Sequence, residues 1–129
     1  MTATFSTPLE NIVNSSSLSG APAVDIMGGA IVFTNTERGR VISTSATAAA
    51  ITITGDGVRI INQSGALIRS SDFLAPAITG SQFADFIDNY GVISGVVRLG
   101  GGNDRYLERT SQSVSLPLNS RTVPHWLNV

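Results

Sequence analysis

The chain repeats one short pattern at a fixed interval. Asn35, Asn62 and Asn89 are 27 residues apart, and each is followed within a few residues by a glycine. A looser copy of the pattern ends at Asn14, 21 residues before Asn35. Intervals of this length are typical of stacked repeats, in which one coil cannot bury its own apolar face and therefore packs on the next.

A large apolar residue lies two positions before each asparagine. If coils stack at the strand spacing of about 4.8 Å, like residues lie over like. The apolar residues should then form an internal column. The asparagines should form a corner column, because asparagine tolerates left-handed backbone and its amide bonds to the next amide in a stack. The predicted structural ladder comprises Phe33, Ile60, Ile87, Asn35, Asn62 and Asn89.

Two further strand-sized segments recur in each period. One begins at Gly39, Gly65 and Gly91, and the other begins at residues 23, 50 and 77. Three short strands per period predict an all-β chain, folded as a right-handed parallel β-helix (β-solenoid) of about four coils with capping termini. Residues 1–10 are expected to be a leader or cap, 11–107 the solenoid repeats, and 108–129 a C-terminal cap or interface tail.

One segment also fits a helix. Phe83, Phe86, Ile87 and Tyr90 have the i, i+3, i+4, i+7 spacing of an amphipathic helix. The repeat register and the following residues 91–95 favour a strand.

Composition excludes several classes of protein. All eight basic residues are arginine, and nine acidic residues bring the net charge to −1, which argues against nucleic-acid binding. Cysteine is absent, so disulfides and thiolate metal sites are excluded. No apolar run approaches the about 18 residues of a membrane span. The N-terminus lacks a cleavable secretion signal. The protein therefore stays inside, leaves by another route, or is cut from a longer chain.

The tail departs from the repeat. Its prolines, Pro117 and Pro124, disfavour ladder pairing, and an open solenoid end needs a cap. The tail is expected either to cover the last coil or to place Trp126 and Leu127 in an interface with a neighbouring subunit. The expected partners are a second copy or neighbouring solenoid coils.

A glycine turn carries the sharpest chemical motif. Residues 99–107 resemble the nonapeptide of the hemolysin-type (RTX) calcium-binding repeats, G-G-x-G-x-D-x-U-x, with Gly100, Gly102 and Asp104 on three of its positions. Leu99 replaces the first glycine, and the nonapeptide occurs once. The resemblance implies a calcium site built from turn carbonyls and the Asp104 carboxylate. The alternative is a tight turn whose aspartate bonds nearby amides, since calcium takes six or more oxygens.

A broader resemblance covers residues 84–107, which look like repeats of large bacterial surface β-solenoids, including autotransporter passengers and RTX-bearing adhesins. This resemblance implies a secreted or surface-displayed protein, hence an extracellular or cell-surface location, and names no ligand.

Catalytic signals are weak. Asp85 and Asp88 are three residues apart, so on a strand they point to opposite faces, and a solvated face is expected for them. His125, the single histidine, has no nucleophile elbow to serve. We therefore expect a non-catalytic structural or adhesive module, with calcium as its one candidate cofactor. The alternative is a carbohydrate-binding or carbohydrate-modifying β-helix that uses acidic residues and arginines such as Arg59 and Arg98 for a glycan.

Overall fold

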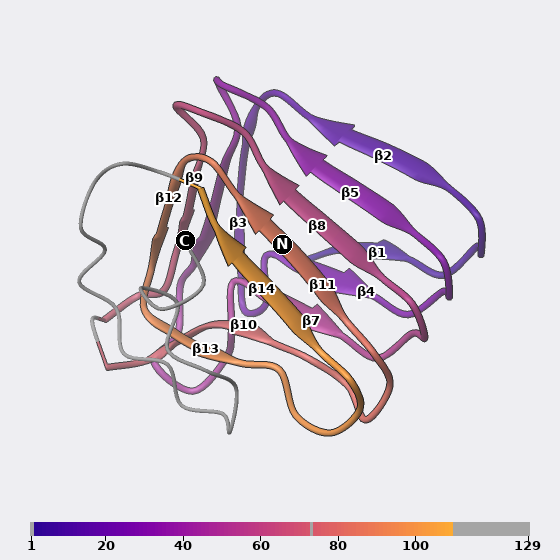
Figure 1. Ribbon diagram of the computed structural model, residues 1–129. Coiled ribbons are helices and arrows are strands. Elements are labelled where there is room, and N and C mark those ends of the chain that lie inside the picture. The colour runs from indigo at the N-terminus through magenta and orange to yellow at the C-terminus, as the bar shows by residue number, and fades with distance from the viewer. Residues whose placement is uncertain (1, 73, 110–129) are drawn as a thin grey trace.

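The computed structural model describes residues 2–72 and 74–109, which form fourteen β-strands and no helix. The strands lie in three parallel sheets (Figure 1). The first sheet contains β1 (Ala3–Phe5), β4 (Val24–Ile26), β7 (Ile51–Ile53), β10 (Pro76–Thr79) and β13 (Val96–Arg98). The second contains β2 (Asn11–Asn14), β5 (Val32–Asn35), β8 (Arg59–Asn62), β11 (Phe86–Asn89) and β14 (Arg105–Glu108). The third contains β3 (Ser17–Gly20), β6 (Arg40–Ser43), β9 (Leu67–Arg69) and β12 (Val92–Ser94).

The chain visits the three sheets in turn, so each coil adds one strand to every sheet. In Figure 1 the strands of the second sheet run side by side in the same direction. This arrangement is a parallel β-solenoid of about four turns, which confirms the predicted fold class. Every strand is three or four residues long, so each contributes one or two inward side chains.

Like residues stack over like. In the second sheet, Ile12 pairs with Phe33, Phe33 with Ile60, Ile60 with Ile87, and Ile87 with Tyr106. Phe33, Ile60 and Ile87 are buried. The other two sheets supply their own columns, and the three columns meet in one continuous core. These columns are Val24, Ile51 and Ile78 in the first sheet and Val41, Ile68 and Ile93 in the third.

Coil length varies while the strand register does not. The corner between the third and first sheets runs over residues 44–50 in one coil, and is Gly95 alone between β12 and β13. Gly95 has a φ of 129°, and a Cβ there would overlap the Ser70 side chain, so this short corner requires glycine. The corners therefore absorb the changes in length that interrupt the 27-residue interval at both ends.

The terminal segments differ in what they contribute. Within residues 1–10, β1 pairs with β4 and so extends the first sheet. Residues 86–89 form a strand paired with β8, so the helical alternative for this segment is wrong. β14 ends at Glu108, and Trp126, Leu127 and His125 lie outside the described residues.

Ile60 tests the core register. Ile60→Ala should lower the free energy of unfolding by about 2–5 kcal/mol, because the side chain is buried between Phe33 and Ile87. Ile61→Ala is the matched control, since its half-buried side chain faces outward on the same strand, and its effect should be well below that of Ile60→Ala. Urea denaturation measures both, and equal losses would contradict the inward assignment.

Candidate functional site

The asparagines form a buried, hydrogen-bonded ladder. The Nδ2 of Asn14 donates to Asn35 Oδ1 at 2.9 Å, Asn35 Nδ2 to Asn62 Oδ1 at 3.0 Å, and Asn62 Nδ2 to Asn89 Oδ1 at 2.9 Å. All three bonds point toward the C-terminal coil. A chain of aligned amides polarises its members and strengthens each bond in the low-dielectric interior.

Two ladder amides also bond to the backbone of the next coil. The Nδ2 of Asn35 donates to the Leu67 carbonyl at 3.0 Å, and that of Asn62 to the Val92 carbonyl at 3.0 Å. A Cβ on Gly39 would overlap the Asn35 side chain. Gly39 therefore leaves room for the Asn35 side chain, whereas the equivalent position of the next coil is Ala66, whose carbonyl accepts a bond from Asn62 Nδ2 at 3.4 Å.

The ladder ends on a carboxylate that the repeat pattern did not predict. Asn89 Nδ2 lies 3.0 Å from both Oε1 and Oε2 of Glu108, and the Tyr106 hydroxyl donates to Oε1 at 3.0 Å. Burial and the neighbouring Glu108 charge raise the pKa of Tyr106 well above its usual value. A carboxylate only accepts hydrogen bonds, so Glu108 receives the last amide of the ladder. Glu108 comes two residues after Tyr106, just as each ladder asparagine comes two residues after a large apolar residue. This spacing is the sequence feature that could have indicated Glu108 as the end of the ladder.

The glycine turn packs directly on the turn one coil earlier. Gly100 and Gly102 have φ values of 77° and 89°. A Cβ on Gly102 would lie 2.6 Å from the carbonyl carbon of Phe83, so the glycines are required by close backbone approach as well as by φ. In this packing, the Asp85 amide donates to Asp104 Oδ1 at 3.0 Å.

Asp85 is buried, whereas the sequence predicted a solvated face. Its Oδ2 accepts a hydrogen bond from the Ser81 amide at 2.9 Å, and the Ser81 hydroxyl lies 3.3 Å away. Burial, with the nearby charges of Asp104 and Asp56 adding to it, raises the pKa of Asp85 to about 6 despite the Ser81 bonds. Asp88 points outward, so these two acids do not converge.

The structure places two carboxylates at this glycine turn. Asp104 and Asp85 lie on successive turns, and each already accepts a hydrogen bond from a backbone amide. In the described part of the chain, no group of three or more His, Cys, Asp or Glu side chains is placed to hold a metal ion. Calcium at Gly100, Gly102 and Asp104 stays a prediction, which a calcium-dependent rise in melting temperature would establish.

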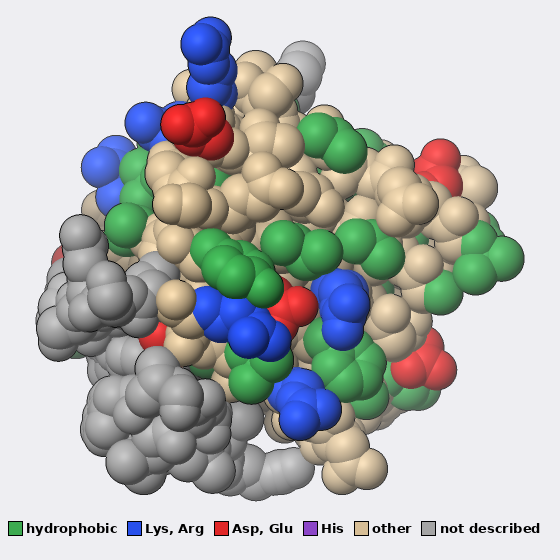
Figure 2. Space-filling model, turned by 45° about the horizontal axis from the view of Figure 1, so that its top comes forward, with side chains coloured by type: hydrophobic (Ala, Val, Ile, Leu, Met, Phe, Trp, Pro, Cys, Tyr) green, Lys and Arg blue, Asp and Glu red, His purple; other side chains and the backbone are tan. Residues whose placement is uncertain are grey.

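The outer surface of the second sheet gathers arginines and aromatic rings. We call this set the arginine–aromatic face: Arg59, Phe86, Asp88, Tyr90, Arg105 and Arg109. Asp88 lies 3.8 Å from Arg59 and 3.8 Å from Arg109, measured between carboxylate oxygen and Nε. Figure 2 shows basic and apolar side chains close together around an acidic group on this side of the molecule.

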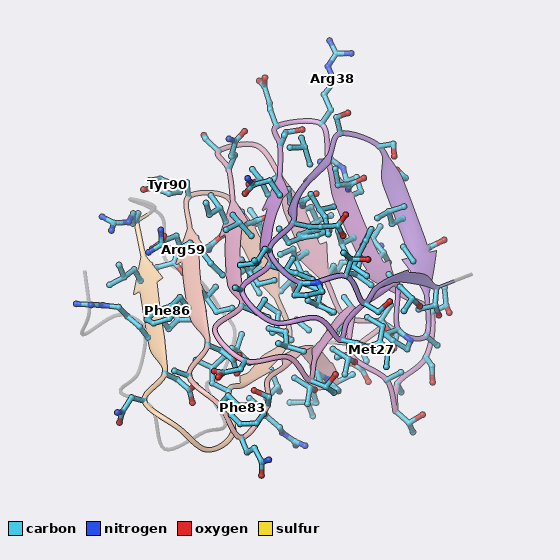
Figure 3. The ribbon with its side chains drawn as sticks, turned by 90° about the vertical axis from the view of Figure 1, so that its right-hand side faces the viewer. Met27, Arg38, Arg59, Phe83, Phe86 and Tyr90 are labelled. Atoms are coloured by element: carbon cyan, nitrogen blue, oxygen red, sulfur yellow. The ribbon has the colours of Figure 1, made fainter. Side chains whose placement is uncertain are left out.

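The rings of this face lie under the arginines. The Arg59 guanidinium lies 6.0 Å from the Phe86 ring centroid, and that of Arg109 lies 5.5 Å from the Tyr90 centroid. Figure 3 shows Arg59, Phe86 and Tyr90 on the same side of the solenoid. Arg98, which the sequence grouped with Arg59, lies in the first sheet instead.

An open depression adjoins the face beside Tyr90. Its volume is about 550 Å³, and it is lined by Glu37, Ile61, Gln63, Ser64 and Tyr90. Tyr90 directly follows the ladder residue Asn89. Gln63 and Arg109 occupy the equivalent positions in the coils before and after it. Tyr90 therefore lies between Arg109 on one side and the depression on the other.

Comparison with known proteins adds no family. No protein family, curated protein or solved structure matches the chain. No helix long and apolar enough to span a membrane occurs among residues 2–72 and 74–109.

Asn62 tests the ladder. Asn62→Ala should lower the free energy of unfolding by about 2–4 kcal/mol, because it leaves buried polar groups of Asn35 and Asn89 without their partner. Asn11→Ala is the matched control, since Asn11 is exposed on β2, and it should change stability by less than about 0.5 kcal/mol. Thermal or urea denaturation measures both, and a small effect at Asn62 would contradict the ladder's structural role.

Asp85 should make stability depend on pH. Because its folded pKa is raised from 3.8 to about 6, the folded state binds the proton more tightly, and stability falls as pH rises from about 4 to 6. Asp85→Asn should remove this loss and be more stable than the unsubstituted protein at pH 7, by up to about 3 kcal/mol. Melting curves from pH 4 to 7 measure it, with exposed Asp72→Asn as the control. An unchanged pH profile in Asp85→Asn would show that Asp85 is not the titrating group.

Proposed function

We propose that the chain is a non-catalytic structural or adhesive module that associates with a second copy through its first coil. The observation that carries this proposal is the edge of the first described coil. β1, β2 and β3 each pair on one edge only, and among the described residues no strand meets their other edge. Such edges are templates for pairing with another chain.

The first coil leaves part of the core uncovered. Phe5, Ile12 and Leu18 face inward and pack on the core, yet each is only partly buried, unlike Phe33 or Val41 in the next coil. A partner that lies across this end would remove their remaining apolar surface from water. The gain is about 25 cal/mol per Å² of apolar area.

The open edge has hydrogen-bonding groups to offer. The amides of Val32 and Thr36 donate to the carbonyls of Glu10 and Asn14, so the even-numbered residues of β2 face β5. The peptide groups alternate along a parallel strand, so those of Val13 face the open edge. Apart from Glu10, the first coil from β1 to β3 carries no charged side chain, so a second copy meets little like-charge repulsion.

The remaining parts of this proposal rest on sequence resemblance. The likeness of residues 84–107 to repeats of bacterial surface solenoids supports a secreted or surface-displayed location. The likeness of the glycine turn to RTX repeats supports calcium binding there. Neither resemblance supplies a catalytic group.

Self-association should depend on the edge of β2. Val13→Pro removes the outward amide and should shift the protein toward monomer, because proline cannot donate to a ladder. Val13→Thr keeps the amide and a similar volume, so it should associate like the unsubstituted protein. Light scattering over a concentration series measures the mass of each. A monomer at every concentration, or association that survives Val13→Pro, would contradict assembly through this edge.

A further inference from the structure

The arginine–aromatic face concentrates positive charge on a chain whose net charge is −1. Arg59 lies on β8, Arg105 on β14, and Arg109 directly follows β14. The guanidinium groups of Arg59 and Arg109 lie near the carboxylate of Asp88, and Arg105 lies beside Phe86 on the neighbouring strand. The local excess of positive charge favours an anionic ligand.

The guanidinium groups are oriented before any ligand arrives. Asp88 contacts both Arg59 and Arg109 at 3.8 Å, and the Phe86 and Tyr90 rings lie beneath them. Both arginine side chains remain about half exposed, at 51% and 45%. A guanidinium whose orientation is fixed in this way still has N–H groups that can donate to a ligand. It binds a ligand carboxylate through two parallel hydrogen bonds, in a bidentate geometry.

The adjoining depression suits a sugar ring better than a phosphate. Tyr90 is 43% exposed and lends an apolar surface, while Gln63 and Ser64 supply hydrogen-bonding groups suited to hydroxyls. Glu37 accepts bonds from hydroxyls and repels anionic groups, so the hydroxyl-bearing part of the ring, and not its carboxylate, lies in the depression. A nucleic acid would also require a longer basic stripe than three arginines.

The spacing of the face fits a polymer. Arg59 and Arg105 occupy one outward column, with Phe86 between them. Two strand spacings separate the arginines by roughly 9.6 Å. This is comparable to the length of an extended disaccharide, so alternate units of an acidic glycan would meet Arg59 and Arg105.

We propose that the arginine–aromatic face binds an acidic polysaccharide. Uronic-acid carboxylates contact Arg59, Arg105 and Arg109, and one sugar ring packs on Tyr90 in the depression. The inference deepens the adhesive role proposed above by naming the class of ligand.

The test compares one double variant with a matched control. Arg59→Gln/Arg109→Gln removes two charges from the face. Arg38→Gln removes a charge from an exposed arginine that points away from it (Figure 3). The probe is an oligogalacturonate, and the binding constant is measured by calorimetry on the full chain. Binding should weaken by about tenfold for each arginine lost, and by less than about twofold in Arg38→Gln.

Tyr90→Ala separates a sugar site from simple charge attraction. It should weaken oligogalacturonate binding more than any weak binding of polyglutamate, because polyglutamate has no sugar ring to pack on Tyr90. A neutral oligosaccharide of the same length should bind more weakly than the uronate, because it lacks the carboxylates. Melting curves check that each variant remains folded.

Three results would overturn the proposal. They are no binding of oligogalacturonate, equal weakening by Arg38→Gln, and binding of polyglutamate or single-stranded DNA as tight as that of the uronate. Light scattering on the same samples reports self-association independently. Loss of glycan binding with intact assembly would leave the structural role standing, and the reverse result would remove assembly alone.

Discussion

The fold depends on the hydrogen-bonded column that runs from Asn14 to Glu108. A buried amide without partners is destabilising, so each rung must meet the next one at hydrogen-bond distance. A slip of one residue would turn every inward side chain outward and also break the column. The apolar column supplies most of the favourable burial energy, whereas the amide column selects one register among those that burial would tolerate.

The same column gives the molecule two different ends. Its amides all donate toward the C-terminal coil, where Glu108 accepts the last bond together with the Tyr106 hydroxyl. At the other end, the first coil leaves Phe5, Ile12 and Leu18 partly uncovered. The inward positions carry similar residues in every coil and stabilise the fold, whereas the residue types at the outward positions differ from coil to coil. The arginine–aromatic face is therefore a local feature built on a uniform frame.

The 27-residue interval predicts the fold because inward positions must repeat for coils to stack. It misses Glu108, because the last coil is shortened to 19 residues and a glutamate replaces the asparagine. It misses Asp85, because the equivalent positions of the two preceding coils are the apolar residues Val58 and Ile31. Acidic residues are usually exposed, so only the stacking of one turn on another reveals that Asp85 is buried. The outward set around Asp88 has no repeat of its own, so it becomes visible only after the register places its members on adjacent strands.

The most direct test of the ladder observes its side-chain amides. In the nuclear magnetic resonance spectra of protein labelled at asparagine, the Asn62 side-chain amide should exchange slowly with water and show contacts to Asn35 and Asn89. Exposed Asn11 should exchange fast in the same sample. Slow exchange with both contacts is the result that in-register stacking predicts. Fast exchange at Asn62, without contacts to its neighbours in the stack, would contradict the account.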